Sequence, residues 1–117
     1  MSASNEDCVF CKIVAGEIPT DFVHEHDDVV AFRDLNPQAP VHVLIIPRKH
    51  IPSMDDATAD HDVILGRMLL AAREIAAKEG IAGAYRLVNN CGAPAGQSVF
   101  HLHLHLLGGR GMSWPPG

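Results

Sequence analysis

The chain has 117 residues, a hydrophobic fraction of 47% and a formal net charge of −5 with histidine counted as neutral. These values predict one globular domain of ordinary composition. The acidic balance argues against a general nucleic-acid-binding protein, which would carry a basic face, and no run approaches the roughly 20 apolar residues that cross a bilayer.

The opening residues 1–7 are polar and acidic and resemble no export signal. We interpret them as a disordered arm ahead of a single domain over residues 8–117. The cysteine count is odd, at three. Without an export signal, this composition favours a reducing compartment, the cytoplasm, where thiols and metal ligands are commoner than disulfides.

The predicted elements follow from the spacing of apolar residues and from turn residues. In chain order they are a short helix within 8–16, strands over 22–26, 29–33 and 41–46, a long helix over 59–79, and strands over 85–90 and 99–107. Thr58 or Asp60 is a cap for the long helix, and Gly80 ends it. Five strands with mostly short connections predict an α+β fold with a mainly antiparallel five-stranded sheet, one long helix and one short helix.

Histidine is the unusual residue, because His101, His103 and His105 alternate with leucines. In a strand, alternate side chains share a face, so the leucines should pack on the helix and the histidines should line a surface or pocket. Three interpretations are open: a solvated strand face, a metal site, or a nucleophilic imidazole. A neutral imidazole is a good nucleophile for phosphorus, and attack would give a covalent nucleotidyl-histidine that water then cleaves.

Two further segments contain residues that could bind an anion or a metal ion. The loop over residues 92–98 is rich in glycine and small residues, so its backbone can approach an anion, and Gln97 and Ser98 add side-chain donors. Cys8-Val9-Phe10-Cys11 has the spacing of half a zinc site, although two free core thiols explain the pair equally well.

Longer sequence motifs in the chain resemble those of a known protein family. His101-Leu102-His103-Leu104-His105-Leu106-Leu107 resembles the histidine triad signature. The matching strings elsewhere are 32–40, His42, 46–51, 96–100 and the Trp-Pro-Pro-Gly ending at 114–117. The chain from Cys8 onward is therefore similar to the Hint branch of the histidine triad (HIT) family.

The resemblance implies a homodimer whose two sheets join into one larger sheet. It also implies hydrolysis of purine nucleoside 5′-monophosphoramidates, and of aminoacyl adenylates, without an organic cofactor. By position, His103 is the nucleophile, His42 and His101 support it, and His105 contacts the phosphate and assists proton transfer; Ser98 completes the catalytic set. We expect no nucleic-acid or membrane partner.

The same resemblance assigns binding residues. Asp34 corresponds to the carboxylate that binds the ribose hydroxyls, and Trp114 lies near the other subunit's pocket. The base is expected between Phe10, Ile13, Ile18, Phe32 and Leu35, and the phosphate beside Asn90, Gly96, Gln97 and Ser98, with His103 and His105. Microbial relatives imply a closed, structural zinc site made by Cys8, Cys11, His50 and His101. Cys91 receives no role.

Three alternatives to the phosphoramidase remain at this point. One is a dinucleoside polyphosphate hydrolase of a sister HIT branch. Another is a nucleotide-binding scaffold protein without turnover. A third is a metal-dependent hydrolase that uses His101, His103 and His105 together, although three ligands in line fit a tetrahedral ion poorly.

Overall fold

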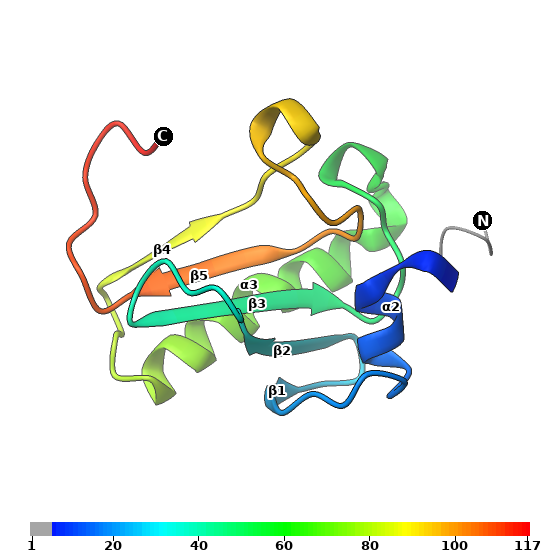
Figure 1. Cartoon of the computed structure of the whole chain (residues 1–117), viewed down its shortest axis with the longest axis horizontal. Helices are drawn as coiled ribbons and strands as arrows, with labels where there is room; N and C mark the ends of the chain where they lie inside the picture. Colours follow the sequence, from blue (N-terminus) through cyan, green and yellow to red (C-terminus); the bar gives the residue numbers. More distant parts are fainter. Residues whose placement is uncertain (1–5) are drawn as a thin grey trace.

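A computed structural model describes residues 6–117 and shows a five-stranded antiparallel sheet with one long helix across one face (Figure 1). The α+β prediction is confirmed. The elements are α2 (Val9–Val14), β1 (Phe22–Glu25), β2 (Val29–Arg33), β3 (Val41–Pro47), α3 (Asp62–Lys78), β4 (Tyr85–Val88) and β5 (Leu104–Gly108), with 3-10 turns at Met54–Asp56, Ala59–His61 and Ala93–Ala95. Of the predicted arm, residues 1–5 lie outside the described residues, and Glu6 and Asp7 are exposed.

The strand order is β1-β2-β3-β5-β4, and every neighbouring pair is antiparallel. Hairpins join β1 to β2 and β2 to β3. The chain then leaves the sheet, forms α3 and returns as β4 at the far edge, so that β5 fills the gap between β3 and β4. This order places the last strand beside the strand that carries His42.

Strands β2 and β3 are buried on both faces because the sheet separates two apolar clusters. Val43 and Ile45 of β3 belong to the cluster under α3, whereas Leu44 and Ile46 belong to the cluster under α2. Leu102, Leu104 and Leu106 pack in the α3 cluster, as predicted from their alternation with histidine. The histidines are therefore directed toward the α2 side of the sheet.

The long helix begins later than predicted. Residues 59–61 form a 3-10 turn, and regular helix starts at Asp62. Thr58 Oγ1 accepts a hydrogen bond from the Asp60 N–H at 3.3 Å, so the predicted cap stands at the start of that turn. At the other end, Gly80 has a φ of +77°, the left-handed conformation that ends helices at glycine.

The last strand is shorter than the predicted range of 99–107. It starts at Leu104, so His101 and His103 precede it. β5 pairs with β3 from Ile45↔Leu104 to Val41↔Gly108, and the same register would put Leu102 opposite Pro47, which has no N–H to donate. The Leu102 N–H instead donates to the Ile51 carbonyl at 2.7 Å.

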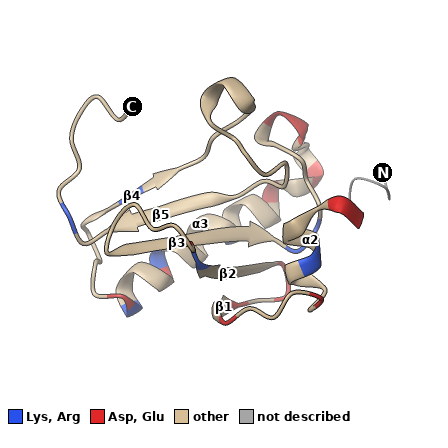
Figure 2. Ribbon diagram, in the orientation of Figure 1, with Lys and Arg blue, Asp and Glu red and all other residues tan. Residues whose placement is uncertain are grey.

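Charged residues are spread over the molecule. Figure 2 shows Lys and Arg on α2, α3, the end of β2 and the C-terminal segment rather than gathered along one element. One ion pair joins the sheet to the long helix: Arg33 at the end of β2 contacts Glu79 just after α3 through two hydrogen bonds of 2.9 and 3.0 Å. Within residues 6–117, no helix has the length and apolar character to span a membrane.

Candidate active site and thiol cluster

A cavity of about 300 Å³ opens on the α2 side of the sheet. Its walls come from α2, the end of β2, β3, the loop at 98–99 and the last segment. The lining residues are Val9, Phe10, Ile13, Phe32, Arg33, Asp34, Leu35, Leu44, Ser98, Val99, His103 and His105. The cavity thus joins an apolar end, a carboxylate and two of the three triad histidines.

His103 is buried at one wall of this cavity, with 5% of its surface exposed. Its Nδ1 lies 2.7 Å from the carbonyl oxygen of His101. A carbonyl only accepts, so Nδ1 carries the proton and Nε2 keeps its lone pair. Among the described residues, no hydrogen bond uses Nε2. The Asn89 side chain donates to the His103 carbonyl at 3.0 Å and so holds this segment where the strand ladder does not.

His42 and His105, here called the imidazole pair, face each other across β3 and β5. Their Nε2 and Nδ1 atoms are 2.9 Å apart. His42 Nδ1 accepts from the Gln38 N–H at 3.0 Å, and Asp34 Oδ2 lies 3.4 Å from His42 Nε2. Asp34 is itself oriented by the Asn36 N–H, which donates to Oδ1 at 2.8 Å. The carboxylate at the cavity is therefore fixed by its own loop.

Burial keeps the imidazole pair neutral. It lowers the pKa of His105 to about 4, with smaller contributions from the neighbouring His103 and His42 and an opposing one from Asp34. Burial also lowers the pKa of His42, against the attraction of Asp34. Both rings are thus uncharged at neutral pH, and each has one N–H and one lone pair.

The apolar end of the cavity matches the predicted base site in part. Phe10 and Phe32 meet edge to face, with ring centroids 5.6 Å apart, and Phe10 also meets His103 at 5.2 Å. Ile13 lines the cavity, and Leu35 lines it while fully exposed. Ile18 lies in an adjoining hollow of about 470 Å³ that shares Ile13, Phe32 and Leu35, rather than in the cavity itself.

The glycine-rich loop differs from its prediction. Gln97 is buried, and its side-chain amide accepts from the Gly92 N–H and donates to the Pro52 and Val99 carbonyls at 2.8–3.0 Å. The backbone N–H groups of Gly96 and Gln97 bond within the loop. These residues brace the loop and have no free donor for a phosphate, whereas Ser98 reaches the cavity.

Asn90 also lies apart from the cavity. It lines a small hollow with Gln38, His42 and His105, behind the imidazole pair. Trp114 is exposed in the described chain, and Cys91 is half-buried. Sequence reasoning missed Asn89 and the Gln38 N–H; Asn89 adjoins a predicted site residue, but a backbone donor leaves no mark in the sequence.

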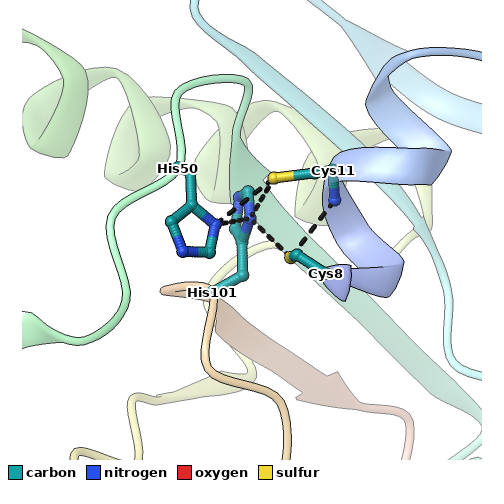
Figure 3. Close-up of side chains that lie close together, drawn as sticks. All are labelled: Cys8, Cys11, His50 and His101. Carbon is teal, nitrogen blue, oxygen red and sulfur yellow. Dashed lines mark hydrogen bonds between the residues drawn. The ribbon is translucent and has the colours of Figure 1, made fainter. Parts of the chain in front are cut away.

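A second group, here called the thiol cluster, consists of Cys8, Cys11, His50 and His101 (Figure 3). The two cysteines lie at the start of α2, His50 follows β3, and His101 precedes β5. Cys8 Sγ and Cys11 Sγ lie 3.3 and 3.5 Å from His101 Nδ1. His50 Nδ1 lies 3.3 Å from both Cys11 Sγ and His101 Nδ1.

The geometry of the thiol cluster fits a tetrahedral metal ion. Zinc bonds of about 2.3 Å to sulfur and 2.0–2.1 Å to nitrogen require ligand separations of about 3.3–3.8 Å. The His101 Nε2–H donates to the Pro47 carbonyl at 2.8 Å, which leaves Nδ1 as a lone pair facing the thiols. Burial, and after it the neighbouring Cys8, raises the pKa of Cys11 to about 11, because a thiolate is disfavoured in a buried place beside a second sulfur.

The triad is therefore divided between two sites. The Nδ1 atom of His101 lies beside the cysteines and His50, whereas His103 and His105 face the cavity. Among residues 6–117, the possible metal-binding groups are the thiol cluster and the set Asp34, His42 and His105. A metal held jointly by all three triad histidines is not among them, which contradicts that alternative.

Comparison with known proteins agrees with the fold and the motifs. The family model described as "Scavenger mRNA decapping enzyme C-term binding" matches residues 7–113. A purine nucleoside phosphoramidase of Escherichia coli K12 is 52% identical over 90% of this chain and 89% of that protein. An uncharacterized HIT-like protein of Synechococcus elongatus is 53% identical over 97% of this chain and 99% of that protein.

Solved structures agree as well. A HIT family hydrolase from Legionella pneumophila superposes with a TM-score of 0.91 at 51% identity, covering 94% of this chain and 99% of that one. One from Clostridium thermocellum gives 0.89 at 50% identity, covering 92% and 95%. The chain belongs to the histidine triad family.

Proposed function

We propose that this protein is a nucleoside phosphoramidase of the Hint branch, which hydrolyses purine nucleoside 5′-monophosphoramidates through a covalent nucleotidyl-His103. The main support is the direction of the hydrogen bond from His103 Nδ1 to the His101 carbonyl, which leaves an unprotonated Nε2 at a cavity with an apolar end and a carboxylate. The 52% identical relative named as a purine nucleoside phosphoramidase supports the substrate class.

The reaction has two displacements at phosphorus. The His103 Nε2 forms a bond to phosphorus while the bond from phosphorus to the amine nitrogen breaks, and the departing nitrogen gains one proton that comes from water. Water then attacks the same phosphorus, the bond to Nε2 breaks, and the nucleoside 5′-monophosphate leaves. Ser98 and His105 line the cavity as hydrogen-bonding groups, and the apolar side chains receive the base.

Asp34 is the proposed partner of the ribose hydroxyls. Its Oδ1 is already held by the Asn36 N–H, so the carboxylate is oriented before a ligand arrives. Phe10, Ile13, Phe32 and Leu35 form the base end of the cavity.

The test is a turnover assay with adenosine 5′-phosphoramidate, followed by mass spectrometry of the acid-quenched enzyme. We expect AMP release and an added adenylyl mass on His103, and a fall of at least about 10³-fold in His103→Ala. His24→Ala, in β1 and outside the cavity, is the matched control. Full turnover by a folded His103→Ala would refute the mechanism. Preferred cleavage of dinucleoside polyphosphates would assign the sister branch, and tight AMP binding without turnover would indicate a binding protein.

We also propose that the thiol cluster holds a structural zinc ion. Four protein ligands complete a tetrahedral shell and leave no position for a reacting water. The bound ion would join α2 to the segment that contains His101. It requires Cys8 and Cys11 to stay reduced, in keeping with the cytoplasmic location expected from the sequence.

A homodimer is the proposed assembly. β4 is an edge strand, and edge strands offer unpaired backbone groups to a second sheet. Val63, Leu69 and Leu70 are exposed on α3, beside an apolar hollow of about 280 Å³ that includes Leu65 and Met68. Light scattering of the purified protein tests this: a monomeric mass at micromolar concentration would exclude the dimer.

A further inference from the structure

We propose that a hollow beside Ser98 receives the leaving amine of the substrate, and that it selects an amine with an apolar body and without negative charge. The hollow, here called the amine hollow, has a volume of about 410 Å³. It is lined by Asp7, Val9, Ser98, Val99 and Phe100, together with two members of the thiol cluster. This inference rests on the proposed function, because only a phosphoramidate has a leaving amine.

The amine hollow adjoins the catalytic cavity. Val9, Ser98 and Val99 line both spaces, so the hollow and the cavity meet at these three side chains. His103 and His105 line the cavity and not the hollow. A substrate with its phosphorus beside His103 can therefore extend one of its groups past Ser98 into the amine hollow.

The two groups on phosphorus need separate places. The proposed nucleoside end contains Asp34, and its apolar side chains continue into the hollow of about 470 Å³ through Ile13, Phe32 and Leu35. In a displacement at phosphorus, the attacking and leaving atoms lie roughly in line, so the amine nitrogen is on the side of phosphorus away from His103. The amine hollow contains none of the four nucleoside-end residues, so an amine there does not compete with the base or the ribose.

The apolar side chains of the amine hollow are accessible to a ligand. Phe100 is 51% exposed and Val9 is 40% exposed, although both are large hydrophobic residues. Val99 is partly buried and packs against the apolar cluster under α2, which fixes one wall. An aliphatic or aromatic amine would cover this apolar surface and release its water, and the Phe100 ring offers a face or an edge to a second ring.

The charge of the amine hollow is negative. Asp7 lines it, and among residues 6–117 no lysine or arginine does so. Figure 2 shows that the turn just before α2, which contains Glu6 and Asp7, is acidic. A carboxylate on the leaving amine would be repelled by Asp7, and a second ammonium group would be attracted. The selection by charge is weaker than the selection by apolar contact, because Asp7 is exposed to solvent.

The experiment compares kcat/KM for two adenosine 5′-phosphoramidates that differ only in the leaving amine. One releases ammonia, which is too small to fill the amine hollow, and the other releases 2-phenylethylamine. Phe100→Ala should lower the ratio of the second kcat/KM to the first by about tenfold, and Phe100→Leu, which keeps an apolar side chain, should restore most of it. Met54→Ala changes an exposed apolar residue outside both spaces and is the matched control.

A second pair of substrates tests the charge. They release 1,5-diaminopentane, which has a second ammonium group, and 5-aminopentanoate, which has a carboxylate at a similar distance. The unmodified protein should prefer the cationic amine, and Asp7→Asn should reduce this preference by about threefold to tenfold at low salt. Asp27→Asn, an exposed carboxylate between β1 and β2, is the matched control and should leave the preference unchanged.

The outcomes separate the amine hollow from the proposed function. An unchanged ratio in folded Phe100→Ala, or an equal loss of turnover with both substrates, would overturn the proposal, because the ring would then not act on the amine. Preference for the anionic amine in the unmodified protein would overturn the assignment of Asp7. Failure of the unmodified protein to release AMP from the ammonia compound would refute the proposed function itself, whereas turnover without dependence on Phe100 would refute the amine hollow alone.

Discussion

The thiol cluster and the imidazole pair use the same residue type in opposite ways. In the thiol cluster, the lone pairs of His50 and His101 and two sulfur atoms converge on one point. In the imidazole pair, His42 Nδ1 accepts from the Gln38 N–H, and His42 Nε2 lies 2.9 Å from His105 Nδ1. Two sulfur atoms and two ring nitrogens gathered around one point suit a cation, whereas rings that are hydrogen-bonded to each other and to the backbone suit an anion. The group that contacts the second nitrogen of each ring therefore decides what the ring can do.

Among the variants that leave the nucleophile in place, the largest effect should come from His105→Leu, which removes the ring N–H from the cavity. We expect kcat with adenosine 5′-phosphoramidate to fall by about 10²–10³-fold, because a donor aimed at developing charge is lost. The metal bound by the thiol cluster should not change, since His105 is not one of its four residues. A variant that loses its metal along with its activity would contradict the separation of the two groups.

The converse change is Cys8→Ser combined with Cys11→Ser. It should abolish metal binding and lower the melting temperature by roughly 10–20 °C, which corresponds to about 4 kcal/mol of lost linkage when free metal exceeds its dissociation constant about 10³-fold. Elemental analysis and calorimetry measure both effects. Cys91→Ser, a thiol outside the cluster, is the matched control, and an equal loss of stability there would remove the metal from the explanation.

Acid should lower the part of the unfolding free energy that depends on His105 in the imidazole pair. The folded-state pKa of His105 is about 4, below the ordinary value of 6.5, so the unfolded chain binds more protons between these values. Its contribution to stability is therefore complete above about pH 6.5 and is lost as the pH falls toward 4. The effect is smaller than metal loss because His105 is partly exposed. Denaturant unfolding of the unmodified protein and of His105→Leu should show a weaker acid dependence in the variant.

Asn89→Ala should give the smallest effect. It removes the 3.0 Å hydrogen bond to the His103 carbonyl, worth about 1 kcal/mol. We expect a loss of unfolding free energy of that size and a modest fall in kcat, with metal content unchanged. An unchanged unfolding free energy and an unchanged kcat would show that the segment before β5 is held in place without the Asn89 hydrogen bond.

The alternation of histidine and leucine was enough to predict the two faces of the last segment and the packing of the leucines under α3. It could not show where the strand ladder begins, because that depends on Pro47 in a strand distant in sequence. Gln97 shows a different limit. Its amide suited a ligand, but only the folded loop reveals that three backbone groups already use it.

The cysteine pair was found from its spacing, but the set of four proposed metal ligands was named from a family resemblance, since two cysteines alone leave free thiols as an equal explanation. The structure brings all four together. The hydrogen bond from the Gln38 N–H to His42 could not be predicted from the sequence, because every residue except proline has a peptide N–H.

His101 takes part in both groups through different atoms. Its ring is anchored at both nitrogens, by the thiols and by the Pro47 carbonyl, while its own carbonyl oxygen orients His103. The direction of the His103 ring is therefore coupled to the contact between α2 and the segment that contains His101. Loss of the proposed metal is therefore expected to change the orientation of the His103 ring even with every cavity residue intact.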